Sequence, residues 1–406
     1  MAKAKTAKKT PLRQIRTVNL GDLHWGAVPP DRLENEFNSI VMPWLRDNQF
    51  EALIQEGDWF DKRLSLDSED AKAAMRCVVQ LCQLCQARNV PFRIIKGTLS
   101  HDYFQLQNYH ALETEYACFR IVSTAAHEEL LPGFDVLWMP EEYPTDYSDF
   151  YSQFFFDEDG NSLVYDAIFG HGEIDVAANW SSMNEGERHY GGTPCHEGEF
   201  LLSHCSGPIW FGHVHNRFRH KQRLGYPGSF TRWCHGEEDP KGFDVLDIVD
   251  YGDDHWTVTA GVVENTLAPE YRTVLATEIL SMTDAPDAIV QKIRAEVGAA
   301  FKLRVKMADF PIGVEELSVV RGALVNDRAV ELVSAARAIN ETPTAANEEV
   351  GETAEASAER QDRLSYLRDP NLPGESRLLR YLHEKFPDRQ DVTLEDVREL
   401  TAPLVG

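Results

Sequence analysis

Residues 15–24 read IRTVNLGDLH, and this stretch decides the fold class that the sequence predicts. The run IRTVNL is typical of a buried β-strand, and it ends at Gly21 in a loop that carries a carboxylate and an imidazole, Asp22 and His24. Comparable apolar runs precede four other loop glycines, in the order FEALIQ before Gly57, FRIIK before Gly97, YDAIF before Gly170 and PIWF before Gly212. The sequence therefore predicts several strands that each end in a polar loop.

Helical patterns cover residues 31–47 and 68–87, so the first three predicted strands alternate with helices. This alternation predicts an α/β domain whose chemistry lies at the carboxyl ends of its strands. From residue 225 to 266 the pattern becomes β, which we interpret as strands of a second sheet or of a sheet edge.

A boundary is expected near residue 268. Beyond it, TVLATEIL and FKLRVKMADF are interpreted as strands, whereas residues 285–301 and 326–339 are interpreted as helices. Residues 341–360 are rich in Glu, Ala and Thr and are typical of a flexible acidic linker, and two short amphipathic patterns follow them. The predicted organisation is a basic tail (1–16), a main domain (17–267), a small α+β domain (268–340), the linker (341–360) and partner-binding helices (361–406).

Composition excludes several classes of protein. The 406 residues contain 43% hydrophobic side chains but no run of about 20 apolar residues, which argues against a membrane span. The amino terminus lacks the apolar stretch of a secretory signal, so we expect the protein in the cytoplasm of a bacterium, or of the host if the source is viral. Seven cysteines without framework spacing indicate reduced thiols, and we interpret the Cys82–Cys85 pair as helix packing.

The loops after the predicted strands carry residues of the types that ligate metals. Besides Asp22 and His24 they contain Gly57-Asp58-Trp59-Phe60-Asp61, Ser100-His101-Asp102, Gly170-His171 and Gly212-His213-Val214-His215. Any one of these motifs alone is weak, because a lone His is more often structural, but five in succession predict a metal site. Oxygen and imidazole ligands without thiolate suit Mn²⁺, Fe²⁺ or Zn²⁺, and two such ions about 3.5–4 Å apart can activate a water molecule for attack on a phosphoryl group.

This series of motifs resembles the calcineurin-like metallophosphoesterase superfamily, and within it the SbcD-type DNA repair nucleases. The nuclease branch is indicated by GHVHNRF, followed by Tyr226-Pro227-Gly228-Ser229 and by Asp239-Pro240-Lys241-Gly242-Phe243. The resemblance covers residues 17–264. It implies a four-layer αββα sandwich, with a small α+β capping domain and C-terminal helices after it.

The resemblance also implies the role of each motif residue. Asp22, His24 and His215 would hold one cation, His171 and His213 the other, and Asp58 would bridge them. His101 would be the acid near the leaving oxygen, oriented by Asp102, and Asp61 would orient its loop. The family usually has Gly-Asn-His-Asp where this chain has a loop two residues longer, with Ser100 in place of the ligand Asn. Because a hydroxyl is a weaker ligand than an amide carbonyl, we expect either a loosely bound second cation or a Ser100 that ligates it through a water molecule.

Substrate contacts are expected beside these motifs. Arg217 and Arg232 flank the last metal loop and are candidates for phosphate contacts, and Tyr103 for stacking on a base, with aromatic packing as the alternative. The net charge of −26 opposes a polyanionic substrate, although the segment 217–223 is locally basic.

Three functions remain open from the sequence. The first is a Mn²⁺-dependent DNA nuclease, with Mg²⁺, Fe²⁺ or Zn²⁺ as alternative metals. It would form a homodimer and work with an SbcC-type coiled-coil ATPase bound by residues 361–406. The second is a phosphoesterase for a nucleotide or a phosphoprotein. The third is a catalytically weak DNA-binding scaffold.

Overall fold

The computed structural model describes residues 9–102, 104–144, 147–178, 195–237, 239–253, 255–297, 302–307, 310–325, 327, 329–333 and 393. The chain divides into two compact units, Met1–Ile339 and Asn340–Gly406. The predicted linker, the predicted partner-binding helices apart from Thr393, and residues 1–8 of the predicted basic tail lie outside the described residues. These assignments and the predicted domain boundaries stay predictions.

The first of two six-stranded sheets contains the strand that opens the chain. Its order is β14 (Thr257–Glu264), β13 (Gly242–Asp250), β1 (Arg13–Leu20), β2 (Ala52–Gln55), β3 (Phe92–Ile95) and β4 (Phe119–Val122). Strands β1 to β4 are parallel, whereas β13 is antiparallel to both β1 and β14. The run from residue 242 to 264 therefore forms an edge of the first sheet, one of the two arrangements expected from its β pattern.

The second sheet is also mixed. Its order is β11 (Phe218–His220), β12 (Leu224–Tyr226), β10 (Ile209–Gly212), β7 (Ala167–His171), β6 (Phe134–Met139) and β5 (Ala126–Leu131). The four central strands are parallel, and the two edge strands are antiparallel to their neighbours. A two-stranded ladder joins β8 (Glu173–Ile174) to β9 (Cys195–His196).

Three apolar clusters show how these layers pack. In the first sheet, alternate residues of β2 point to opposite faces, so Leu53 packs under the helices and Ile54 packs toward the second sheet. Ile54 shares a cluster with Trp138 and Phe169, which come from the second sheet. The two sheets therefore lie face to face, in a mixed α/β fold.

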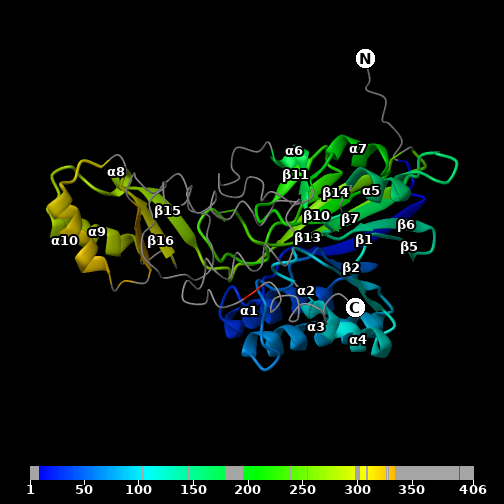
Figure 1. The fold of residues 1–406 in the computed structure, drawn as a ribbon, viewed down its shortest axis with the longest axis horizontal. Helices are drawn as coiled ribbons and strands as arrows, with labels where there is room; N and C mark the ends of the chain where they lie inside the picture. Colours follow the sequence, from blue (N-terminus) through cyan, green and yellow to red (C-terminus); the bar gives the residue numbers. More distant parts are fainter. Residues whose placement is uncertain are drawn as a thin grey trace, which may run out of the picture. The chain divides into compact units, whose positions relative to one another are not determined.

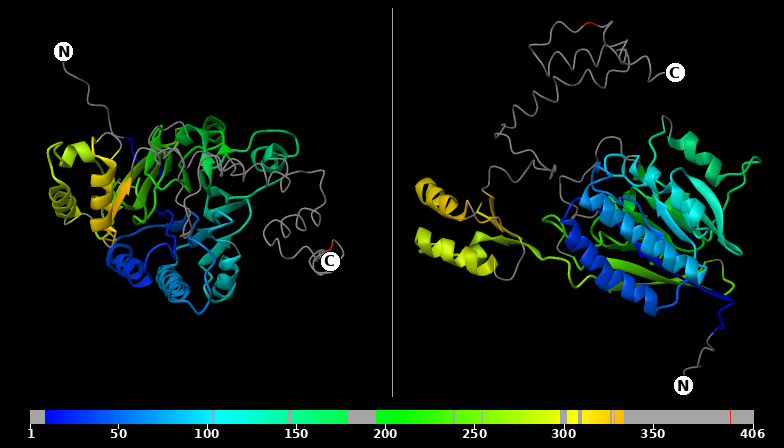
Figure 2. Two further views of the ribbon diagram at one scale, coloured as in Figure 1. Left: turned by 60° about the vertical axis from the view of Figure 1, so that its left-hand side comes forward. Right: turned by 90° about the horizontal axis from the view of Figure 1, so that it is seen from below.

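Helices cover the outer faces of both sheets (Figure 1). Over the first sheet lie α1 (Pro30–Glu36), η1 (Phe37–Val41), α2 (Met42–Asp47), α3 (Glu69–Arg88), η2 (Gln105–Tyr109) and α4 (His110–Glu115). Over the second lie α5 (Tyr147–Phe155), α6 (Asp175–Ala178) and α7 (Gly198–Ser203). Figure 2 shows the two long helical segments running side by side across their sheet.

The two helices predicted between the first three strands are confirmed. Residues 30–47 are helical throughout, with a π-helical segment at Phe37–Val41, and α3 spans Glu69–Arg88. The side chain of Ser68 caps α3 by accepting a hydrogen bond from the backbone N of Ala71, and Asn89 ends the helix in the left-handed conformation.

A three-stranded parallel sheet follows in the region predicted to be a small α+β domain. It contains β15 (Tyr271–Leu275), β16 (Lys302–Lys306) and β17 (Val330–Val333), with α8 (Ala276–Ile279), α9 (Pro286–Val297) and α10 (Val314–Leu324). Two predictions were wrong: residues 276–279 are helical rather than extended, and residues 330–333 form a strand rather than a helix. Residues Val330–Val333 pair with β16, and this pairing overrides the helical pattern of the sequence around them.

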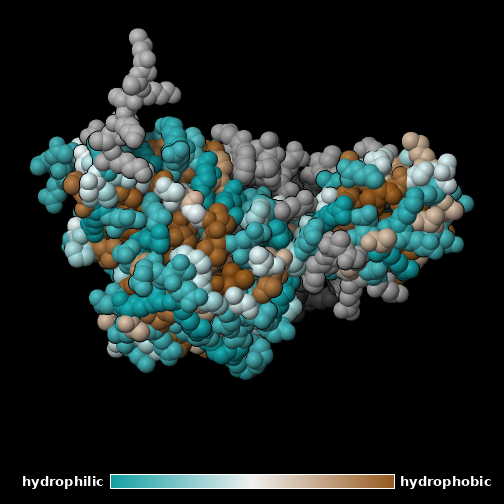
Figure 3. Space-filling model, turned by 180° about the vertical axis from the view of Figure 1, so that it is seen from behind, coloured by the Kyte–Doolittle hydropathy of each residue, from teal (hydrophilic) through white to brown (hydrophobic). Residues whose placement is uncertain are grey.

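The face drawn in Figure 3 is largely hydrophilic, with apolar patches among the hydrophilic residues. Among the most exposed large apolar side chains, Val314, Val325 and Met282 belong to the region of the three-stranded sheet. In the described part of the chain, no helix combines the length and apolar character that crossing a bilayer requires.

Candidate metal centre

The carboxyl ends of five strands bring most of the predicted ligands together, with Thr98 among them in place of Ser100. Asp22, Asp58 and Thr98 follow β1, β2 and β3 of the first sheet, whereas His171 ends β7 and His213 follows β10 of the second sheet. The backbone N of His213 donates to both carboxylate oxygens of Asp22, at 3.0 and 3.2 Å, and so joins the two sheets at this edge. The loops that were recognised separately in the sequence form one buried cluster.

Asp58 is shared by two groups of side chains that could each hold a cation. One group is Asp58, His24 and His101, and the other is Asp58, His171 and His213; in each, one ligand atom per residue lies within 4.8 Å of the others. The Oδ2 atom of Asp58 is 3.4 Å from Nε2 of His171 and 3.9 Å from Nε2 of His24. This geometry fits the bridging role predicted for Asp58.

His215 belongs to the same cluster through His24. The Nε2 atoms of these two rings lie 3.0 Å apart. Two nitrogens bonded to one cation at about 2.1 Å and 90° to each other are separated by about 3.0 Å. The pair therefore has the spacing of two ligands of a single ion, as the sequence predicts for His24 and His215.

Two of the candidate ligand histidines have their outer ring nitrogens fixed by hydrogen bonds. Nδ1 of His171 lies 2.7 Å from the backbone O of Glu56, and Nδ1 of His215 lies 2.7 Å from Oε1 of the buried Glu237. Both partners are acceptors, so Nδ1 donates in each hydrogen bond and Nε2 is the ring nitrogen that faces the cluster. Glu237 was not identified from the sequence, because no motif marks it.

The backbone around the cluster is unusually constrained. His24, Asp58 and His213 have positive φ angles of 51°, 49° and 99°. Non-glycine residues rarely adopt this region of φ, and each one that does costs about 1–3 kcal/mol of folding free energy. Strained residues of this kind gather at functional sites. Gly97 has no such φ but allows a close approach, because a Cβ there would lie 2.2 Å from the backbone N and Oδ1 of Asp58.

Burial and charge make the cluster suited to cations. Asp22, Asp58 and Glu141 are each 1% exposed, and among the described residues no Lys or Arg forms an ion pair with them. Burial acts to raise the pKa of Asp58, but His171 and His101 outweigh it and hold this pKa well below its ordinary value. Buried carboxylates require compensating positive charge, which divalent ions would supply.

His101 and Asp102 have different surroundings from those expected. Nδ1 of His101 lies 2.7 Å from Oδ2 of Asp58, and its ring is partly exposed. Asp102 instead accepts hydrogen bonds from the backbone N of Phe60 and of Gly97, at 3.0 and 2.7 Å. It therefore holds two ligand loops together rather than orienting His101, because a fully buried carboxylate is best satisfied by backbone donors. Burial raises the pKa of Asp102 to about 7.

Thr98, rather than Ser100, places its hydroxyl at the cluster. Ser100 is exposed in the turn, whereas Oγ1 of Thr98 lies 3.3 Å from both Oδ2 of Asp58 and Nε2 of His171. The two extra residues of the loop follow Thr98, so this residue keeps the place directly after the strand-end glycine. The position of Thr98 directly after Gly97 could have identified it from the sequence.

Arg217 and Arg232 bind protein groups. Arg217 contacts Asp244 through Nε at 3.2 Å and donates to the backbone O of Pro240, and Arg232 donates to the backbone O of Glu237 and of Asp239. The phosphate contacts expected of these residues receive no support, because both guanidinium groups hold the loop that carries Glu237. Tyr103 lies outside the described residues.

The segments that indicated the nuclease branch support the His215 loop. The backbone O of His215 accepts hydrogen bonds from Nζ of Lys241 at 2.7 Å and from the backbone N of Ser229 at 3.0 Å. Gly228, at φ 76°, is packed against the same carbonyl. Lys241, Ser229 and Gly228 therefore position His215, a candidate ligand, through contacts within the protein.

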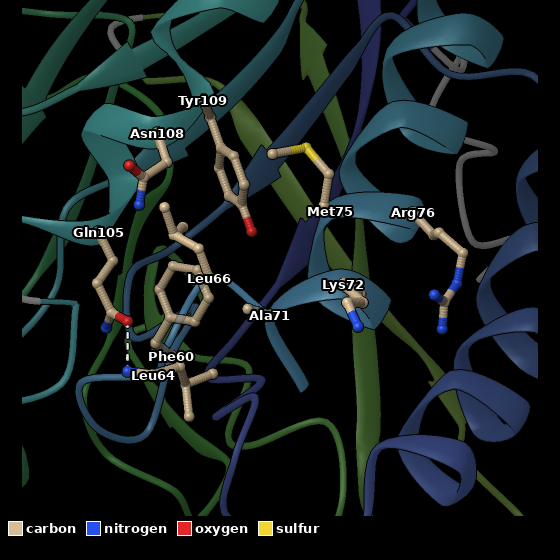
Figure 4. A pocket seen from close by; sticks show the side chains of 10 residues that line it. All are labelled: Phe60, Leu64, Leu66, Ala71, Lys72, Met75, Arg76, Gln105, Asn108 and Tyr109. Carbon is tan, nitrogen blue, oxygen red and sulfur yellow. Dashed lines mark hydrogen bonds between the residues drawn. The ribbon is translucent and has the colours of Figure 1, made fainter. Parts of the chain in front are cut away.

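An apolar pocket of about 370 Å³ is lined by Phe60, Gln105 and residues of α3, among others (Figure 4). Gln105 accepts from the backbone N of Leu64 at 2.6 Å and donates to the backbone O of His101 at 3.3 Å, so it links the pocket wall to a candidate ligand. The two cationic residues that line the pocket form ion pairs, Lys72 with Glu69 and Arg76 with Glu34. The pocket is thus suited to an apolar group rather than to a phosphate.

Comparisons with known proteins do not identify a family. No family model matches the chain, and neither does any curated protein. TT1561 of Thermus thermophilus is a solved structure to which the chain is 10% identical, with a TM-score of 0.34 over 62% of this chain and 100% of the other. A further crystal structure, described without a protein name, is 11% identical with a TM-score of 0.36 over the same shares. The α/β fold and the His/Asp cluster are compatible with a metallophosphoesterase.

Proposed function

We propose that the protein is a two-metal phosphodiesterase with the four-layer αββα sandwich of the metallophosphoesterases. The observation that carries this proposal is Asp58, whose Oδ2 atom lies 3.4 Å from Nε2 of His171 and 3.9 Å from Nε2 of His24, so one carboxylate is shared by both candidate metal groups. His215, which lies beside His24, would complete the first group, and His101 would act as the acid. When bound, a pair of divalent cations would supply Lewis-acid charge for a phosphoryl oxygen and lower the pKa of a water molecule. We propose Mn²⁺ as the natural ion.

The side chains of the chain itself provide the rest of the chemistry. The histidines His24, His171 and His215 present their Nε2 atoms to the cluster. The side chain of His101 is partly exposed to solvent, so a proton on its ring would be available to a leaving alkoxide. Burial lowers the pKa of His101, but the neighbouring carboxylates of Asp58 and Asp61 outweigh it and raise this pKa above its ordinary value.

DNA is the substrate that we propose, on the resemblance to the SbcD-type nucleases. The protein would then act as the nuclease subunit of an ATP-driven complex, as a homodimer whose residues 361–406 bind a coiled-coil ATPase. The net charge of −26 and the internal pairing of Arg217 and Arg232 favour a second candidate, a phosphodiesterase for a small nucleotide substrate.

Hydrolysis assays separate these candidates. Purified protein with Mn²⁺ should degrade linear or hairpin DNA, and the same preparation should hydrolyse a chromogenic diester. Diester hydrolysis without DNA cleavage, with and without candidate ATPase, would favour the small-substrate enzyme. Activity that persists in Asp58→Ala would overturn both candidates.

A further inference from the structure

A carboxylate that the sequence motifs do not include lies against the second metal group. Oε2 of Glu141 is 3.7 Å from Nε2 of His171 and 3.7 Å from Nδ1 of His213. The same oxygen is 3.2 Å from Oγ1 of Thr98, and the residue is 1% exposed. Glu141 thus lies beside His171 and His213 of the second sheet and Thr98 of the first sheet, which surround the candidate cation position.

The chain holds Glu141 in this position from two sides. Glu141 follows the carboxyl end of β6 by two residues, and its backbone N donates to the backbone O of Lys96 at 3.2 Å. The loop after β6 is thereby joined to the loop that contains Thr98. The hydroxyl of Tyr143 binds the other carboxylate oxygen, Oε1. Oε2 is therefore the oxygen that faces the histidines.

These separations agree with common coordination of one ion. Ligands bonded to a cation at about 2.1 Å are about 3.0 Å apart at 90° and about 4.2 Å apart at 180°. The two distances of 3.7 Å from Glu141 fall within this range. We propose that Glu141 is a ligand of the cation held by Asp58, His171 and His213, an inference that rests on the proposed two-metal function.

Glu141 then supplies the oxygen that the missing Asn would provide in the family that the chain resembles. An anionic oxygen binds a divalent ion more strongly than a neutral amide does, and it favours harder cations such as Mn²⁺ and Mg²⁺. With Glu141 as a ligand, we expect the second cation to bind more tightly than the loose site that Ser100 alone led us to expect. With Asp22 and Asp58, Glu141 places three carboxylates around two divalent ions.

Calorimetric titration of the full chain with Mn²⁺ tests this assignment, using Glu141→Gln and a matched control, Glu142→Gln. Glu142 is the adjacent residue, and its Oε2 accepts a hydrogen bond from the backbone N of Ala125 rather than facing the histidines. We expect two ions per chain for the wild type and for Glu142→Gln. In Glu141→Gln, one ion should bind with unchanged affinity and the other at least about tenfold more weakly.

The outcomes distinguish this inference from the function on which it rests. Wild-type protein that binds no Mn²⁺ would overturn the two-metal proposal. Two tightly bound ions in both the wild type and Glu141→Gln would overturn the role of Glu141 alone. If circular dichroism shows that Glu141→Gln is unfolded, Glu141→Asp replaces it; this variant keeps the charge but shortens the side chain, so weaker binding of one ion is expected and unchanged binding refutes the assignment.

Discussion

Gly97 is the position at which one added methyl group tests the geometry of the metal cluster. A Cβ at this residue would lie 2.2 Å from the backbone N and from Oδ1 of Asp58, whereas real Cβ contacts are not closer than 3.0 Å. In Gly97→Ala, Asp58 and the new Cβ must therefore move apart by about 0.8 Å, the difference between 3.0 and 2.2 Å. Displacements of about 1 Å at a reacting centre cost about 100-fold in rate. Because the φ of Gly97 is not positive, alanine adds no backbone strain, and the loss would come from this contact.

Hydrolysis of a chromogenic diester with saturating Mn²⁺ measures this effect. We expect kcat to fall about 100-fold and the affinity for Mn²⁺ to fall with it. Gly322→Ala is the control, because a Cβ at that helical residue has no atom within 4 Å; it should retain full turnover and gain up to about 1 kcal/mol of stability. Full turnover and normal Mn²⁺ binding in Gly97→Ala would refute the close packing of Gly97 on Asp58.

Three further changes test other parts of the site. His101→Ala should retain both ions in calorimetry but lose turnover, and loss of an ion would instead make His101 a ligand. Glu237→Ala removes the acceptor of His215 and should weaken Mn²⁺ binding about 10–100-fold, whereas unchanged binding would show that this hydrogen bond is dispensable. Chelation by EDTA should lower the melting temperature by about 5–10 °C relative to protein in Mn²⁺ at 100 times its Kd, and equal melting temperatures would mean that no ion binds the folded state.

Deletion of residues 341–406 tests the predicted division of the chain. Hydrolysis of the small diester should stay within about twofold of the full chain, because the candidate ligands all precede this segment. Binding of a coiled-coil ATPase, measured by co-purification, should be lost. Loss of diester hydrolysis in a folded truncation would place the segment in the hydrolytic unit.

The repeating strands and loops were predictable because their signals are local. A run such as FRIIK followed by Gly97 marks both a buried strand and the loop at its carboxyl end, and parallel pairing brings such loops together. The helices at 30–47 and 69–88 follow from periodicity and from the cap at Ser68. The strand Val330–Val333 was missed because its extended conformation depends on pairing with β16.

The surroundings of the ligands were less predictable because they depend on contacts between distant segments. Glu141 and Glu237 have no motif of their own, and they reach the cluster through the loop after β6 and through the loop held by Arg232. Asp102 is next to His101 in sequence, yet its carboxylate faces two backbone N–H groups. Sequence adjacency identifies a loop, whereas side-chain direction within the loop is set by burial and by the available donors.

The most direct test of the shared cluster is electron paramagnetic resonance of the full chain loaded with Mn²⁺. Because Asp58 is common to both metal groups, we expect two ions per chain with the spectrum of a magnetically coupled pair, and loss of that coupling in Asp58→Ala. A wild-type spectrum of isolated Mn²⁺, or of no bound Mn²⁺, would contradict the account.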